Sequence, residues 1–191
     1  MANIKGNALQ GIKLYVQEKH GAAGLEKWLS ALPPTEQTIL RGLVLPASWY
    51  PVGIWHRCLD SYVNAFGRGD PEAFRPVAEF IAANDLTKIF KLLLTLASPA
   101  MIVRRAGMLW ERYYDVGTLS ATELGPTEYL LHLKCNTQQD EGANLIICSV
   151  GVPAWLMRAA TIAGARNIVG QHQACRFRGA AACEINMRWS A

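Results

Sequence analysis

The sequence predicts an α+β domain in which an N-terminal helical layer packs on an antiparallel sheet. Three observations predict it. Apolar residues recur at helical spacing over the first hundred positions, short aromatic and β-branched runs follow from about residue 110, and a long apolar helix interrupts those runs after residue 142. A chain of 191 residues can bury a core of its own, so residues 1–191 are expected to form a single domain.

The N-terminal half is predicted to be helical because its apolar residues recur every three or four positions. Leu9, Ile12 and Val16 share one helix face, and Gly21 is expected to end that helix. The pair Asp70-Pro71 has the N-cap and the first-turn proline that open a helix. The other predicted helical segments are Leu25–Leu32, a helix capped by Thr35 and reaching Leu43, Ile54–Phe66, residues 70–98 with a break near Asn84-Asp85, and a last segment ending at Leu109.

The C-terminal half is predicted to form strands around one long helix. Glu128–Cys135 alternates apolar and polar positions with the period of two that a half-buried strand requires. The apolar segment Gly142–Ala163 is the predicted long helix, and Gly151 and Pro153 should kink or split it. The five predicted strands are Trp110–Tyr114, Thr118–Leu124, Glu128–Cys135, Asn167–Gln173 and Cys183–Trp189, the last two joined around Gly179.

Composition limits the class of protein. Hydrophobic residues make up 51% of the chain and charged residues 18%, which excludes a disordered polyelectrolyte. The nineteen basic residues are spread along the chain and the net charge is only +4, so no nucleic-acid partner is expected. The low charged fraction fits either a large core or an apolar surface that a protein partner covers.

The sequence predicts neither a membrane span nor a secretory signal. The most apolar stretch, residues 92–103, contains Pro99 and is too short to cross a bilayer about 30 Å thick. The N-terminus has no apolar run followed by a small-residue cleavage site. We therefore expect a cytoplasmic protein. In that reducing compartment, five cysteines are expected to be buried, reactive or metal-bound rather than paired in disulfides.

The densest group of metal-ligand residue types lies near the C-terminus. Cys175 and Cys183 are symmetric about Gly179, and as partners across a hairpin their Cβ atoms would be about 4.5–5.5 Å apart. That spacing suits a shared zinc ion, a disulfide, or simply two compact buried side chains. His172 would point to the opposite face of a flat strand, so it joins the cysteines only if the chain bends or bulges. Cys148, on the predicted helix that should cover the sheet, is the candidate fourth ligand.

No pattern in the sequence predicts catalysis. There is no Ser-His-Asp context, no phosphate-binding glycine loop and no HExxH. Cys175 has Arg176 and Arg178 beside it, which could lower its pKa, but no general base lies nearby in the sequence. We therefore do not expect an enzyme.

Several stretches resemble a known superfamily of ligand-binding domains. They are His172-x-x-Cys175 with the seven-residue gap to Cys183, the preceding cysteine-bearing helix, the closing Arg188-Trp189, Leu45–Pro51 and Leu109–Gly117. Together they resemble the superfamily of haem-nitric-oxide-binding proteins, TRAPP Golgi-tethering subunits and vinyl-reductase-type sensor domains. Within it, the chain is most similar to a myxobacterial family. The resemblance covers nearly the whole chain.

This resemblance implies a helical layer against a twisted antiparallel sheet, often dimeric, with a buried cavity in some members. In phenol-sensing relatives, zinc is held by an upstream cysteine, a glutamate and two further cysteines. Cys175 and Cys183 have the spacing of the last two, and Cys148 falls close to the first. His172 lies near the position of the glutamate, which is a departure from the pattern but leaves a sensible set of three cysteines and one histidine.

The haem-binding relatives imply less about this chain. Its opening, from Ile4 to Gly21, resembles theirs, but their haem-contacting Tyr-x-Ser-x-Arg motif does not occur in the sequence. His56 also lacks the context of an axial ligand. Haem is therefore not expected.

Two functions are consistent with the sequence. The first is a non-enzymatic small-molecule sensor or adaptor, with a structural zinc ion and an apolar ligand between helices and sheet. Trp110, Tyr113 and Tyr129 are candidates to line that site, although each could equally be a core residue. The second is an assembly module, either a homodimer or a subunit of a complex, which binds no small ligand.

Overall fold

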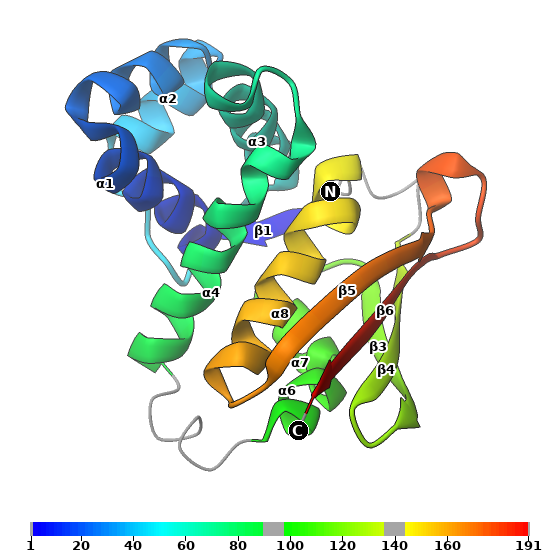
Figure 1. Ribbon diagram of the computed structural model, residues 1–191. Helices are drawn as coiled ribbons and strands as arrows, with labels where there is room; N and C mark the ends of the chain where they lie inside the picture. Colours follow the sequence, from blue (N-terminus) through cyan, green and yellow to red (C-terminus); the bar gives the residue numbers. More distant parts are fainter. Residues whose placement is uncertain (1, 90–97, 136–143, 191) are drawn as a thin grey trace.

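The computed structural model of the chain describes residues 2–89, 98–135 and 144–190. Helices lie along one face of an antiparallel sheet, so the predicted α+β class is confirmed (Figure 1). The helical elements of these ranges are α1 (Gly6–Ser30), α2 (Pro34–Arg41), α3 (Val52–Gly67), the 3-10 helix η1 (Pro71–Phe74), α4 (Arg75–Ile89), α6 (Pro99–Arg104), α7 (Ala106–Glu111), the π-helix η2 (Ile147–Gly151), α8 (Val152–Ile162) and the 3-10 helix η3 (Arg176–Arg178).

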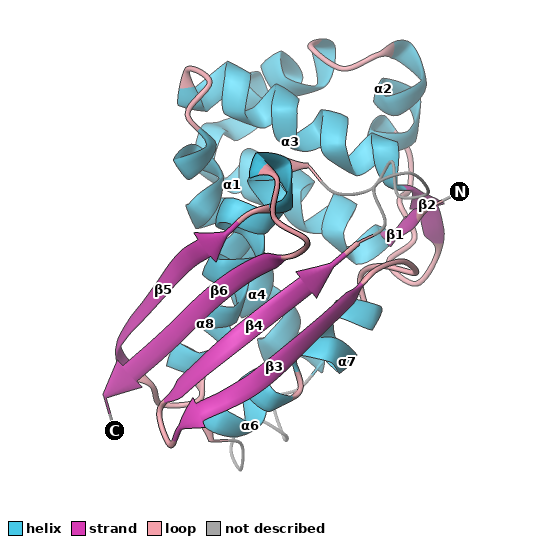
Figure 2. Ribbon diagram, turned by 90° about the vertical axis from the view of Figure 1, so that its right-hand side faces the viewer, coloured by secondary structure: helices cyan, strands magenta, loops and turns pink. Residues whose placement is uncertain are grey.

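The sheet has four antiparallel strands in the order β3-β4-β6-β5, and a separate two-stranded ribbon joins β1 to β2. Figure 2 shows the four strands in front of α8, α6 and α7, with α1, α2 and α3 beyond one end of the sheet. The strands are β1 (Asn3–Lys5), β2 (Trp49–Pro51), β3 (Thr118–Gly125), β4 (Glu128–Lys134), β5 (Arg166–Ala174) and β6 (Cys183–Ser190).

The strand β4 shows why the sheet has one buried face. Tyr129, Leu131 and Leu133 are completely buried, and Leu131 lies opposite Ile185 of β6, which is buried as well. The alternate residues of β4 belong to the other face. The predicted period of two is therefore confirmed, and it directs the sheet's apolar side chains toward the helices.

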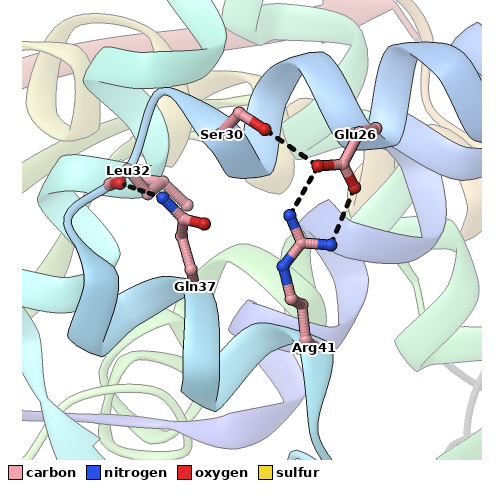
Figure 3. Close-up of polar contacts among 5 residues, drawn as sticks. All are labelled: Glu26, Ser30, Leu32, Gln37 and Arg41. Carbon is pink, nitrogen blue, oxygen red and sulfur yellow. Dashed lines mark hydrogen bonds and ion pairs between the residues drawn. The ribbon is translucent and has the colours of Figure 1, made fainter.

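The helix α2 is attached to its neighbours by two ion pairs of different burial. Arg41 donates to both carboxylate oxygens of Glu26 at 2.7 and 2.6 Å, and Ser30 donates to the same carboxylate at 2.9 Å (Figure 3). These hydrogen bonds, first from Arg41 and then from Ser30, lower the pKa of Glu26 to about 2. The other pair joins the buried Glu36 to Arg57 of α3, with Arg57 Nε 2.7 Å from Glu36 Oε1.

One predicted strand is wrong. Trp110–Tyr114 forms the end of α7 and the turn after it, where the amides of Tyr113 and Tyr114 both donate to the carbonyl of Trp110. Trp110 and Tyr114 are four residues apart, and their rings stack with centroids 4.0 Å apart. Their aromatic character was typical of a strand, but a spacing of four also brings two rings together on a helical turn.

Other boundaries differ in smaller ways. The predicted break near Asn84-Asp85 is wrong, because α4 continues to Ile89, and α2 begins at Pro34, before the expected cap Thr35. The N-cap at Asp70 is confirmed, since its side chain accepts from the amide of Glu72 at 3.0 Å. The predicted stop at Gly21 is a kink (φ 67°) inside α1, and the break near Gly151 is the end of the π-helix. Parts of the predicted 70–98 helix and the start of the Gly142–Ala163 segment lie outside the described residues.

We expect Gly6→Ala to lower the free energy of unfolding by about 2 kcal/mol. A Cβ atom on Gly6 would lie 2.1 Å from the carbonyl oxygen of Leu45, and a backbone atom cannot move away as a side-chain tip can. Chemical denaturation measures the loss. Gly125→Ala is the matched control, because a Cβ there has no neighbour within 4 Å. Equal stability of the two variants would contradict the close approach of Gly6 to the carbonyl oxygen of Leu45.

None of the helices among the described residues is long and apolar enough to cross a membrane.

Candidate functional site

The four predicted metal ligands come together. The ligand atoms of Cys148, His172, Cys175 and Cys183 all lie within 4.8 Å of one another, and the three cysteines are buried. Different parts of the C-terminal half supply them. Cys148 lies in the π-helix η2, His172 lies in strand β5, Cys175 directly precedes the 3-10 helix η3, and Cys183 begins β6. Residues separated by up to 35 positions in the sequence thus converge at one end of the sheet.

The sulfur spacing fits a shared metal ion better than a disulfide. The Sγ atoms of Cys148 and Cys175 are 3.9 Å apart, and both cysteines, like Cys183, are free thiols. A tetrahedral zinc ion with Zn–S bonds of about 2.3 Å separates its sulfurs by about 3.8 Å. A disulfide would require about 2.05 Å. The spacing excludes a formed disulfide between these two cysteines. It is equally the distance of a hydrogen bond between two compact buried thiols, so the zinc and core-packing alternatives both agree with it.

A strand irregularity brings His172 to the cysteines. His172 pairs with Ile185, but Ala174 pairs with the adjacent Glu184, so the register of β5 shifts between His172 and Ala174. This is the bulge that the sequence required for His172 to share a face with the cysteines. The Nε2 atom of His172 is buried and has no hydrogen-bond partner. A buried imidazole nitrogen with no partner is a suitable metal ligand.

The electrostatics of the cluster favour one ionised thiol. Hydrogen bonding from the Cys148 thiol is the largest cause of a lowered pKa at Cys183, and the backbone of Arg176 and the His172 side chain lower it further. The pKa of Cys148 is raised, because it shares that hydrogen bond and is partly desolvated. The thiolate is the form of cysteine that binds metal ions.

The segment that carries Cys148 is a π-helix, a form that often occurs at functional sites. It begins where the side chain of Asn144 accepts from the amide of Ile147 at 3.0 Å, and it ends at Gly151, two residues before Pro153. Ile147 and Gly151 also line the internal cavity described next. One short segment therefore contributes to both sites.

An apolar cavity of about 70 Å³ lies between the helices and the sheet. Two of the three predicted ligand-site residues, Trp110 and Tyr113, line it. Tyr129 is not among the lining residues, and its ring instead stacks on Trp189 with centroids 5.6 Å apart. The sequence did not identify four other aromatic residues of the wall: Trp55, Phe74, Tyr114 and Trp155.

A buried polar network borders the cavity. The hydroxyl of Tyr113 donates to the carboxylate of Asp85 and accepts from Trp155 Nε1 at 3.1 Å, and the side chain of Asn7 donates to the same carboxylate at 2.9 Å. Burial, and then the negative charge of Asp85, raise the pKa of Tyr113. The network joins α1 and α4 to α8, so it fixes the wall of the cavity from both halves of the chain.

No protein-family model and no curated protein matches the sequence. Among solved structures, the chain is similar to an H-NOX protein from S. oneidensis in the Fe(II)NO ligation state (TM-score 0.75, 11% identity, 98% of this chain and 99% of that chain). It is also similar to an Fe(II) unliganded H-NOX protein from K. algicida (TM-score 0.71, 10% identity, 98% and 97%). A third is the IWP-051-bound H-NOX from Shewanella woodyi (TM-score 0.68, 9% identity, 97% and 94%).

At these identities the likeness establishes the fold alone, and that fold is the one of H-NOX domains. The fold that the resemblance implied, a helical layer against an antiparallel sheet, is thus confirmed. No comparison supports the narrower placement in a myxobacterial family.

The sequence predicted that the protein does not bind haem. The comparisons do not support that prediction, because the similar structures carry iron in stated ligation states. The lining residues allow a test on this chain. Among the described residues around the cavity there is no histidine, cysteine or methionine, the side chains that hold haem iron in most haem proteins. The described wall of the cavity therefore offers no ligand of these kinds for haem iron.

Proposed function

We propose that the protein is a non-enzymatic sensor or adaptor domain that holds a small apolar molecule in its internal cavity. The cavity itself is the observation that carries this function. Its wall includes Ala8 of α1 and Trp55 of α3 on one side and Leu119 of β3 and Trp155 of α8 on the other. An occupant would therefore contact both halves of the domain and could change how they pack.

We further propose that Cys148, His172, Cys175 and Cys183 hold a structural zinc ion. Three sulfurs and one nitrogen complete a tetrahedral coordination sphere, and a closed site of this kind leaves no position for a substrate or an activated water. The metal would join the π-helix η2 to both strands of the β5–β6 hairpin. This role is structural, which agrees with the absence of a catalytic motif in the sequence.

Hydrogen–deuterium exchange tests the sensor role. The zinc-loaded protein is compared with and without a saturating apolar gas, for which xenon is the probe. A sensor should transmit occupancy, so protection should change in backbone amides beyond the lining residues, for example in α2. If protection changes only in the lining residues, the cavity binds a ligand but the result contradicts the sensor role.

One surface feature favours the alternative, an assembly module that forms a homodimer or joins a complex. Leu43, Leu45 and Trp49 are close together in the sequence around the loop from α2 to β2, and their exposed fractions are 82%, 50% and 43%. Exposed apolar side chains this close together are typical of a surface that a protein partner covers. Sedimentation equilibrium discriminates: concentration-dependent association weakened by Leu43→Ser supports the module, and a strict monomer at high concentration contradicts a homodimer.

A further inference from the structure

We propose that the internal cavity is a haem-free binding site for a compact apolar molecule smaller than benzene. The inference rests on the cavity of the proposed function and adds the class and size of its occupant. It also separates this chain from the iron-bearing structures that share its fold.

Aromatic side chains fill the interior where a large cofactor would need space. Trp110 and Tyr114 stack with centroids 4.0 Å apart, and Trp55 and Phe74 meet edge to face at 6.0 Å. The space left beside them is about 70 Å³, less than half of the roughly 150 Å³ of an engineered apolar cavity that binds benzene or xenon. A molecule smaller than benzene therefore fits without moving these rings.

Iron has no free ligand at the cavity. All four histidines belong to described residues and none lines it: His20 stacks on Phe66, His132 lies 3.5 Å from Glu184, His172 is in the cysteine cluster, and His56 is half-buried on α3. Of the undescribed residues, 90–97, 136–143 and Ala191 contain no histidine, cysteine, methionine or tyrosine, and the remaining one is Met1.

Tyrosine can also bind haem iron, but the two tyrosine hydroxyls at the cavity are already engaged. Tyr113 is held by Asp85 and Trp155, and Tyr114 accepts from Trp55 Nε1 at 2.9 Å. Freeing either hydroxyl for a metal would leave a buried polar partner without its hydrogen bond.

Hydrogen bonds within the protein also occupy the polar groups of the cavity wall, so few of them are left for an occupant. The three indole N–H groups are directed to protein acceptors, including Trp110 Nε1 to the carbonyl of Val116 at 2.8 Å. An occupant is therefore offered mainly carbon surface, and apolar cavities of this kind exclude water and take up small apolar molecules. The cavity would then select among molecules by their size and by their lack of polar groups.

Two cavity variants and three probes, xenon, haemin and benzene, test this inference on the zinc-loaded chain. Xenon binding is measured by xenon NMR, and haemin binding by the Soret band. We expect saturable xenon binding by the unmodified protein and at least a tenfold weaker affinity in Ala106→Leu, whose larger side chain would occupy the cavity. We expect Leu156→Ala, which enlarges the cavity, to accept benzene, which the unmodified protein excludes.

Either of two results would overturn the inference. One is a stoichiometric haemin complex with a sharp Soret band that competes with xenon. The other is the absence of saturable xenon binding both in the unmodified protein and in Leu156→Ala. Leu156→Ala keeps the test valid if Ala106→Leu does not fold. Xenon binding without a long-range change in hydrogen exchange would contradict the sensor role while leaving this inference intact.

Discussion

Replacing Cys183 with serine is expected to release the proposed zinc ion and to lower the free energy of unfolding on the order of 5 kcal/mol. Cys183 is completely buried and begins β6, so losing its thiolate removes one ligand and leaves two other thiols and an imidazole nitrogen without a shared ion. Because the site forms only in the folded chain, the binding free energy of zinc contributes directly to folding.

The measurements are zinc content after purification without chelator, and chemical denaturation of the same samples. Cys135→Ser is the matched control, since Cys135 is half-buried and lies outside the cluster, and its zinc content should stay at one ion per chain. A zinc-free unmodified protein would remove the metal proposal. Full zinc occupancy in Cys183→Ser would show that Cys183 is not a ligand.

The second large effect is expected at the ion pair between α2 and α3, whose carboxylate, Glu36, is buried. Arg57→Met should lower the free energy of unfolding by about 3 kcal/mol, because it leaves the carboxylate of Glu36 buried without its cation. The double variant Glu36→Leu/Arg57→Met should recover much of that loss, since an apolar pair of similar size needs no partner. Urea denaturation of both variants measures the two values.

Arg41→Met provides the control for the loss of a charge alone. The pair Arg41–Glu26 also joins α2 to a neighbouring helix, but both side chains are exposed and water can solvate either one (Figure 3). We therefore expect a much smaller loss than in Arg57→Met. If the two arginine variants lose equal stability, burial of Glu36 is not the source of the effect.

The fold class and the metal cluster could be predicted because both depend on short-range spacing. The alternation in Glu128–Lys134 fixes which face of the sheet is buried, and the positions of His172, Cys175 and Cys183 place three candidate ligands within one hairpin. Cys148 was included because its helix was expected to pack on that hairpin. The prediction that His172 joins the cysteines depended on a β-bulge. A bulge depends on the pairing between strands, which a single sequence does not show.

Features that depend on distant partners could not be predicted. Strands β1 and β2 are three residues each and exist because Ile4 pairs with Tyr50, far away in the sequence. Trp110–Tyr114 has the composition of a strand, and only its packing shows a helical turn. Tyr129 was a reasonable candidate for the cavity, but whether an aromatic residue contacts a cavity or another ring depends on tertiary packing.

The π-helix η2 has a consequence for the thermodynamics of the whole domain. Cys148 belongs to the cysteine cluster, while Ile147 and Gly151 of the same five residues form part of the cavity wall. If the domain binds both the proposed zinc ion and a cavity molecule that displaces this segment, each ligand changes the affinity for the other by the same factor. Reciprocity of this kind follows from a shared segment and requires no contact between the two ligands.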